Sequence, residues 1–119
     1  MKQMEYKSLH APDEVRSFPK GKLELVTLDG VTFGKATLQP GWKWSESIKP
    51  IAKTKSCEAP HTQYHASGRI KVKMDDGTEK EFGPGDVSVI PPGHDEWVVG
   101  NDPVVLIDIT GMTNYASPK

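Results

Sequence analysis

The sequence predicts an all-β protein, an antiparallel barrel or jelly roll with at most one or two short helical turns. Two observations carry this prediction. Eleven glycines and ten prolines interrupt nearly every stretch that could form a long helix. Between these breaks lie about nine short runs, several of them alternating apolar and polar residues, joined by Gly, Pro and Asp turns at close spacing. Such a pattern is typical of antiparallel sandwiches and barrels.

The helical turns are expected near the start of the chain, at residues 11–18, because Pro12-Asp13-Glu14 is a helix-start signal. Strands are expected, in chain order, at residues 23–28, 31–39, 69–74, 78–82, 86–90, 96–99 and 104–109. The run 69–74 shows the clearest alternation, with Ile70, Val72 and Met74 on one face and Arg69, Lys71 and Lys73 on the other.

The chain is predicted to be one domain, because 119 residues suffice for a single modest core. We divide it into an N-terminal arm at residues 1–22, a barrel at 23–110 and a C-terminal tail at 111–119. Residues 42–60 form the least regular connection inside the barrel. Connections of that length in a compact domain often serve as functional lids or walls.

Charge and hydropathy exclude several classes of partner. Fifteen basic residues balance sixteen acidic ones, so no basic patch for nucleic acid or anionic membrane is indicated. The apolar runs are far too short to span a membrane, and the first ten residues lack the apolar run of a signal peptide. Cys57 is the only cysteine, which excludes an intrachain disulfide and fits a reducing compartment. We therefore predict a cytoplasmic protein.

Residues 83–93, GPGDVSVIPPG, resemble the second conserved motif of the cupin superfamily, which reads Gly, five residues, Pro, any residue, Gly. Residues 61–74 are similar to the end of the first cupin motif, where a strand reaches a tight turn at Gly68. The resemblance covers roughly residues 36–110. It implies a small single-domain cupin barrel with a divalent transition metal inside it, of which Fe, Ni, Zn and Mn are the candidates.

The metal ligands of the family are two His and one Glu in the first motif and one His in the second. This chain lacks the usual His-x-His pair, and only Cys57 could substitute for it there. The spacing places His61 at the position of the motif Glu, and Glu96 at the position of the motif His. The two residue types are therefore exchanged.

Period-2 alternation adds further candidates to the same interior. His94 shares a face with Glu96, and His61 shares one with Gln63 and His65. Imidazole, carboxylate and thiolate are common ligands of transition metals, so the predicted metal ligands are His61, His94, Glu96, Cys57 and His65. Glu96 is also the candidate catalytic residue, as a general base.

Each candidate also has a purely structural interpretation. An interior histidine can simply be hydrogen-bonded, a lone cysteine is most often a small buried hydrophobe, and Glu96 could lie in water at the barrel mouth. Gln63 could orient a ligand or bind substrate. Trp42 and Trp44 share a face and are expected either to pack in the core or to wall a ligand pocket.

Three functions remain open at this point. The first is a metal-dependent enzyme on a small polar molecule, such as a dioxygenase or isomerase; the second is a small-ligand binding or sensing module; the third is a structural domain. Fold alone does not choose between them. We also predict a homodimer, because apolar residues in the N-terminal segment, including Met4 and Tyr6, can cover the sheet edge of a neighbour.

Overall fold

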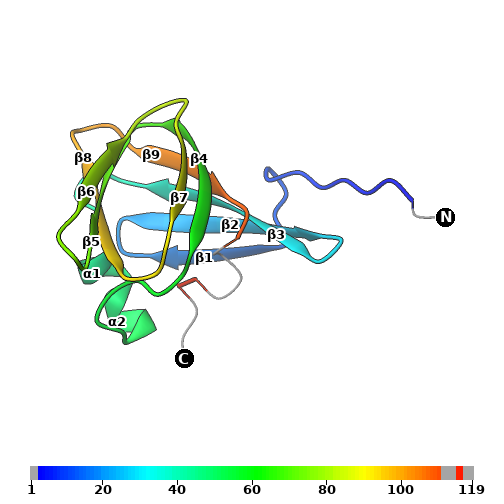
Figure 1. The fold of residues 1–119 in the computed structure, drawn as a ribbon. Helices are drawn as coiled ribbons and strands as arrows, with labels where there is room; N and C mark the ends of the chain where they lie inside the picture. Colours follow the sequence, from blue (N-terminus) through cyan, green and yellow to red (C-terminus); the bar gives the residue numbers. More distant parts are fainter. Residues whose placement is uncertain (1–2, 111–114, 117–119) are drawn as a thin grey trace.

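The computed structural model describes residues 3–110 and 115–116 of the chain, which form two facing antiparallel β-sheets (Figure 1). The larger sheet has six strands in the order β1-β2-β3-β9-β4-β7, and the smaller has three in the order β6-β5-β8. The strands are β1 (Glu14–Phe18), β2 (Gly21–Leu28), β3 (Val31–Leu38), β4 (His61–Ser67), β5 (Arg69–Met74), β6 (Glu79–Phe82), β7 (Val87–Ile90), β8 (His94–Val99) and β9 (Val104–Asp108).

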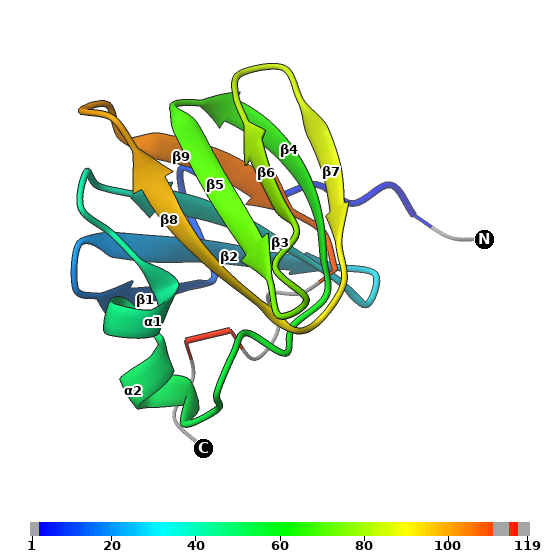
Figure 2. The same ribbon diagram turned by 60° about the vertical axis from the view of Figure 1, so that its left-hand side comes forward.

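The prediction of an antiparallel jelly roll is confirmed. Figure 2 shows β5, β6 and β8 lying across the inner face of the larger sheet. In β5 the predicted alternation holds, because Ile70 and Val72 are buried while Lys73 is exposed. The turn between β4 and β5 needs glycine: Gly68 has a φ of 75°, and an added Cβ would lie 2.3 Å from the Pro103 carbonyl oxygen.

The predicted helix at residues 11–18 is wrong. That segment contains β1, which pairs antiparallel with β2 from Glu14 opposite Leu25 to Phe18 opposite Gly21. The helix-start signal is local and weak, whereas pairing with β2 satisfies the backbone groups and buries the Phe18 ring against the core. The six-stranded sheet therefore begins within the segment that we assigned to the arm.

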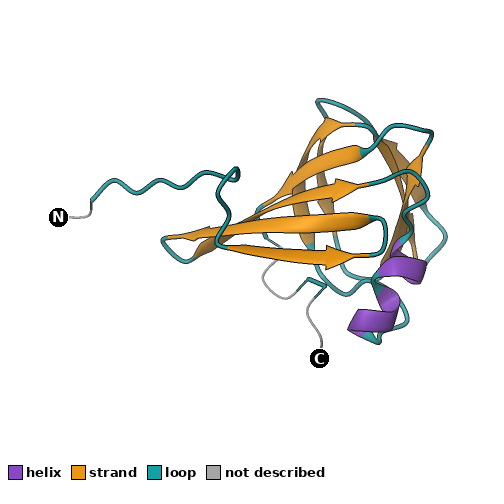
Figure 3. Ribbon diagram, turned by 180° about the vertical axis from the view of Figure 1, so that it is seen from behind, coloured by secondary structure: helices purple, strands orange, loops and turns teal. Residues whose placement is uncertain are grey.

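The connection at residues 42–60 contains the two short helices, α1 (Trp44–Ser47) and α2 (Lys49–Ala52), which close one end of the sandwich (Figure 3). Trp42 and Trp44 are both 1% exposed and belong to the hydrophobic core. The prediction that they pack in the core is confirmed. The alternative, that they line a ligand pocket, stays a prediction.

The interior of the sandwich is divided between apolar and polar side chains. The apolar core gathers residues of β1, β2, β3, β5, β8 and β9 with the two buried tryptophans. Polar or charged side chains are buried on the inner faces of β4, β7, β8 and β9, namely His61, Gln63, His65, Ser88, His94, Glu96 and Asp108. Buried polar groups need partners, so this set marks the part of the interior where chemistry is to be sought.

The N-terminal residues before β1 extend away from both sheets (Figure 1). Met4 and Tyr6 are 94% and 88% exposed there, so these two side chains, which we expect to cover a neighbour, are left almost entirely in solvent. The homodimer stays a prediction. Most of the predicted C-terminal tail lies outside the described residues. No helix in the described part of the chain is long and apolar enough to cross a membrane.

Candidate metal centre

Two strands and one loop bring the predicted ligands together. His61 begins β4 in the larger sheet, and His94 begins β8 in the smaller one. The loop before β4 is pinned to the start of β8, because the Cys57 amide donates to the His94 carbonyl at 2.8 Å and the Gly93 amide donates to the Cys57 carbonyl at 2.7 Å. The Pro-Pro-Gly turn thus fixes Cys57 beside both histidines.

Cys57, His61 and His94 form a buried group whose ligand atoms all lie within 4.8 Å of one another. The Cys57 Sγ lies 3.7 Å from His61 Nε2, and the centroids of the two imidazole rings are 5.3 Å apart. All three residues are at most 3% exposed. The two sequence motifs therefore meet at one point in the interior, as the spacing predicted.

Hydrogen bonds outside the group turn both imidazoles toward it. The Nδ1 of His94 lies 2.9 Å from the Pro91 carbonyl oxygen, which can only accept, so Nδ1 carries the proton. The Nδ1 of His61 lies 2.5 Å from the Asp108 carboxylate and donates in the same way. In their neutral forms both rings then present an Nε2 lone pair to the group, which is how partners outside a metal site orient histidine ligands.

Two buried polar atoms at this place have no hydrogen-bond partner among the described residues, His94 Nε2 and Glu96 Oε2. Leaving such atoms unpaired is costly. Two imidazole nitrogens, a thiolate and a nearby carboxylate are a donor set that suits Zn, Fe, Co or Ni. The residues present therefore fit a divalent transition metal.

The charges of the group act on one another. Burial alone would lower the pKa of His61, but the hydrogen bond to Asp108, the contact with Cys57 and the charge of Glu96 together raise it to about 10. Burial would raise the pKa of the Cys57 thiol, and the two histidines outweigh it and lower that pKa. Burial likewise opposes protonation of His94, but Cys57 and Glu96 raise its pKa. The opposite shifts at Cys57 and His61 have one cause, because a thiolate and a protonated imidazole stabilise each other.

The comparisons with known proteins agree with this architecture. Solved structures align along most of the chain, among them the polyketide cyclase RemF from Streptomyces resistomycificus, with a TM-score of 0.64 and 16% identity over 92% of this chain and 80% of that one. A cupin-like protein from Thermotoga maritima aligns with a TM-score of 0.56 and 16% identity over 85% and 75% of the two chains. The chain has the cupin fold.

An oxalate decarboxylase from Lactobacillus farciminis, crystallised as a formate complex, shares this fold with a TM-score of 0.61 and 19% identity. The alignment covers 86% of this chain and 32% of the decarboxylase, so the chain spans about a third of that protein's length. No protein-family model matches the chain, and no curated protein matches it in sequence. The predicted resemblance to cupins is thus confirmed at the level of fold.

Glu96, another of the predicted ligands, lies beside the group of three. Glu96 is buried on the same face of β8 as His94, as predicted, and its charge acts on Cys57, His61 and His94. Glu96 is not a member of the group of three found among the described residues. The chain thus offers three converging ligands with a carboxylate beside them.

His65, also predicted as a ligand, is not brought to this group. It lies four residues further along β4, about 13 Å away at the usual rise of a strand. Its Nε2 is 2.8 Å from the Ser88 hydroxyl, and its ring stacks on Phe82 with centroids 5.1 Å apart. Burial lowers the pKa of His65.

Gln63 lies between the two histidines on the same buried face. Its Nε2 donates to the Asp108 carboxylate at 3.0 Å, while its Oε1 has no partner among the described residues. Gln63 therefore helps to hold the carboxylate that orients His61. Its predicted role in binding substrate stays a prediction, and it has one acceptor atom left for that role.

Two residues of the site were missed from the sequence. Asp108 was detectable, because it follows Val104 and Leu106 at every second position of a strand whose inward face is otherwise apolar. Tyr115 was not, because it lies beyond the last strand. Its ring meets that of His61 edge to face with centroids 5.7 Å apart, and burial and the neighbouring carboxylates raise its pKa well above the usual value.

Proposed function

We propose that this protein binds a divalent transition metal through Cys57, His61 and His94 and uses it on a small molecule bound beside Glu96. The observation that carries the proposal is the convergence of three ligand atoms within 4.8 Å, with both imidazoles turned inward by Asp108 and Pro91. A divalent metal supplies Lewis acidity and open positions for a small molecule or for oxygen.

The number of ligands favours an enzyme over a closed binding site. Structural metal sites close around four protein ligands, whereas catalytic sites use three and keep a position open. In the part of the chain that the structure describes, three residues converge, and the Oε2 of Glu96 beside them has no hydrogen-bond partner. In this arrangement Glu96 accepts a proton from the bound molecule, as the general base of a dioxygenase or isomerase would. A polyketide cyclase and an oxalate decarboxylase among the proteins of the same fold support this direction.

The second candidate is a binding or sensing module without turnover. One feature favours it: Glu96 is buried on the same face of β8 as His94 and its charge acts on all three ligands, so Glu96 is the residue placed to supply a fourth. The centre would then be closed. The two candidates therefore differ in whether Glu96 is a ligand.

Cobalt titration tests both candidates. The protein is purified without a His-tag, analysed for metals, stripped and titrated with Co²⁺ alone. We expect one Co²⁺ per chain and a near-ultraviolet thiolate-to-cobalt charge-transfer band. Cys57→Ser should remove the band, His61→Ala and His94→Ala should abolish binding, and His65→Ala is the matched control that should change neither. A wild-type protein that binds no Co²⁺ would overturn the proposal.

Glu96→Gln decides between the two candidates. If Glu96 is not a ligand, the visible spectrum of the Co²⁺-loaded variant should be unchanged, as an enzyme with an open metal position requires, even if loss of the nearby charge weakens binding. If the visible bands shift, the carboxylate completes the coordination sphere, and the binding module is the better description.

A further inference from the structure

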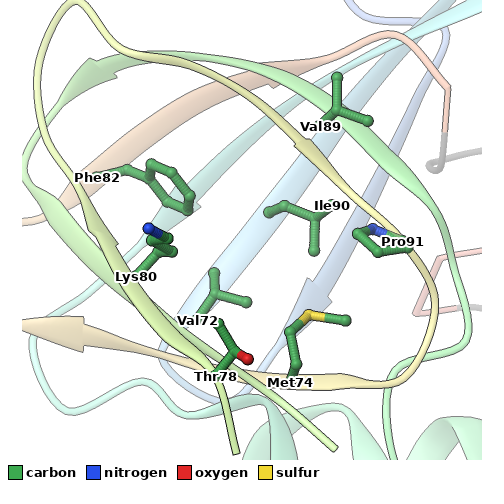
Figure 4. Close-up of a pocket in the computed structure, with 8 residues that line it drawn as sticks. All are labelled: Val72, Met74, Thr78, Lys80, Phe82, Val89, Ile90 and Pro91. Atoms are coloured by element: carbon green, nitrogen blue, oxygen red, sulfur yellow. The ribbon is translucent and has the colours of Figure 1, made fainter. Parts of the chain in front are cut away.

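A second feature of the molecule is a cavity of about 150 Å³, open to solvent, between the edge strands of the two sheets (Figure 4). It lies where β6, the edge of the smaller sheet, faces β7, the edge of the larger one. Its lining is mostly apolar and comes from β5, β6, β7 and the turns beside them, with Val72, Met74, Thr78, Lys80, Phe82, Val89, Ile90 and Pro91.

Strand register places this cavity beside the metal centre. Three lining residues are direct cross-strand partners of centre residues: Val72 of Glu96, Met74 of His94, and Ile90 of His61. Side chains paired in this way project from the same face of the sheet with their Cβ atoms about 4.5–5.5 Å apart. Val72 and Ile90 are buried, as are their partners, so the shared face is the interior. The cavity therefore lies next to the centre, and the side chains of Val72, Met74 and Ile90 stand between the two.

The size and the lining of the cavity specify an apolar occupant. A volume of about 150 Å³ has room for a molecule of the size of benzene, and this cavity opens to solvent at the edge of the sandwich, where Val89 is 78% exposed. Val72, Met74 and Ile90 offer hydrocarbon and thioether surface, and Phe82 adds an aromatic ring. A phenyl ring or a branched alkyl group fits this description, whereas a small, wholly polar molecule would lose its hydration without compensation.

A positive charge stands at the mouth of the cavity. Lys80 is opposite Val72 in the register of β5 and β6, so its side chain leaves the strand on the inner face. Its neighbours Glu79 and Glu81 pair with Lys71 and Arg69 instead. Within the described residues no carboxylate lies within ion-pair distance of the Lys80 amine. An anionic group of a ligand at the mouth of the cavity could therefore pair with the exposed Lys80 amine.

We propose that the small molecule handled by this protein is an amphipathic monocarboxylate. Its ring-sized apolar part fills the cavity, its carboxylate meets Lys80 at the mouth, and the apolar part faces the metal centre across Val72 and Ile90. This inference rests on the proposed function for its link to the metal, but the cavity and Lys80 can be tested without it.

The test uses benzoate as the probe, with benzyl alcohol as the uncharged ring and acetate as the charge without a ring. Methyl signals of Val72, Met74 and Ile90 report binding in NMR spectra of the metal-free protein. We expect benzoate to shift them, benzyl alcohol to bind about tenfold more weakly for want of the charge-assisted contact, and acetate to have no effect. Lys80→Met should remove the difference between benzoate and benzyl alcohol. Lys71→Met, on the opposite face of β5, is the matched control and should preserve it.

A second measurement tests the link to the metal. In the Co²⁺-loaded protein, the paramagnetic ion should broaden the NMR signals of the ring protons of bound benzoate.

If neither ring compound shifts the methyl signals, the inference is wrong, although Co²⁺ binding would still support the proposed function. If Lys80→Met leaves the preference for benzoate unchanged, Lys80 only protects the edge strand and the assignment of a carboxylate falls. Benzoate bound without broadening would place it apart from the metal and overturn the link. Benzoate binding in a protein that takes up no Co²⁺ would overturn the proposed function and keep the cavity as a ligand site.

Discussion

His61 and His65 lie on the same strand, on the same buried face, and only Gln63 separates them on that face, yet their surroundings differ in kind. His61 donates to the Asp108 carboxylate and faces a thiol and a second imidazole. His65 meets a neutral hydroxyl and the face of Phe82. The pKa of His61 is raised to about 10, whereas that of His65 is lowered.

The difference shows that burial does not decide what an interior histidine does. Both side chains are 1% exposed, and burial by itself lowers the pKa of each. A carboxylate within hydrogen-bond distance reverses this effect at His61, whereas the charge of Asp86 acts on His65 in the same direction without outweighing burial. Four residues of one strand thus separate a candidate ligand from a histidine whose role is packing and hydrogen bonding.

The largest expected effect comes from removing the charged partner of His61. Asp108→Ala leaves a protonated imidazole without its buried counter-charge, and we expect a loss of about 3–5 kcal/mol in the free energy of unfolding. The matched change at the other end, Ser88→Ala, removes a neutral hydrogen bond from His65 and should cost about 1 kcal/mol. Urea denaturation of both variants without metal gives the two values. Equal losses would remove the distinction between the two histidines.

Metal affinity should follow the same division. Asp108→Asn keeps the shape of the side chain but no longer holds His61 with a charge, so we expect Co²⁺ affinity to fall about 10–100-fold. His65→Gln should leave the affinity unchanged, because His65 is not brought to the group of three. Competition titrations against a chelator of known affinity provide the comparison. Loss of affinity in the His65 variant would show that the centre extends further along β4 than the structure places it.

Metal binding should also release protons. With a pKa of about 10, His61 is protonated at pH 7 in the metal-free protein, and its Nε2 must lose that proton before it can bind a metal. Protons held by the Cys57 thiol and by His94, whose pKa is also raised, add to this release. We expect at least about one proton per Co²⁺ at pH 7, measured by calorimetry in buffers of different ionisation enthalpy. A heat of binding that does not depend on the buffer would contradict the protonated state of His61.

The effects of pH on the stability of the metal-free protein have opposite signs at the two histidines. The folded-state pKa of His61 lies above its unfolded value of 6.5, so its contribution to stability is complete below pH 6.5 and is lost as the pH rises toward 10. The folded-state pKa of His65 lies below 6.5, so its contribution is complete above pH 6.5 and declines as the pH falls below it.

NMR titration of the imidazole carbon-bound protons separates the two groups. The His61 signal should move near pH 10 and the His65 signal below pH 6.5. In denaturation experiments, His61→Gln should flatten the loss of stability between pH 6.5 and 10, and His65→Gln should flatten the loss on the acid side. Titration of both signals near pH 6.5 would mean that their environments do not differ in solution.

Local patterns in the sequence predicted most of the strands and the inward face of the centre. The alternation through His61 and Gln63, and through His94 and Glu96, needs only the two-residue period of a strand, and the structure buries all four. The resemblance of residues 83–93 to a cupin motif placed the turn before His94 correctly. These features depend on neighbours in the chain, which the sequence displays directly.

Tertiary structure alone decided the rest. Residues 11–18 carry a helix-start signal, and pairing with β2 overrides it. Asp108 is 47 residues from His61 in the chain and 2.5 Å from it in space, because β9 lies beside β4 in the larger sheet. His65 has the same period and face as His61, but the strands that pack against its end supply Ser88 and Phe82. Electrostatic and hydrogen-bond energies depend on distances of a few ångströms, and the order of strands in the two sheets sets those distances.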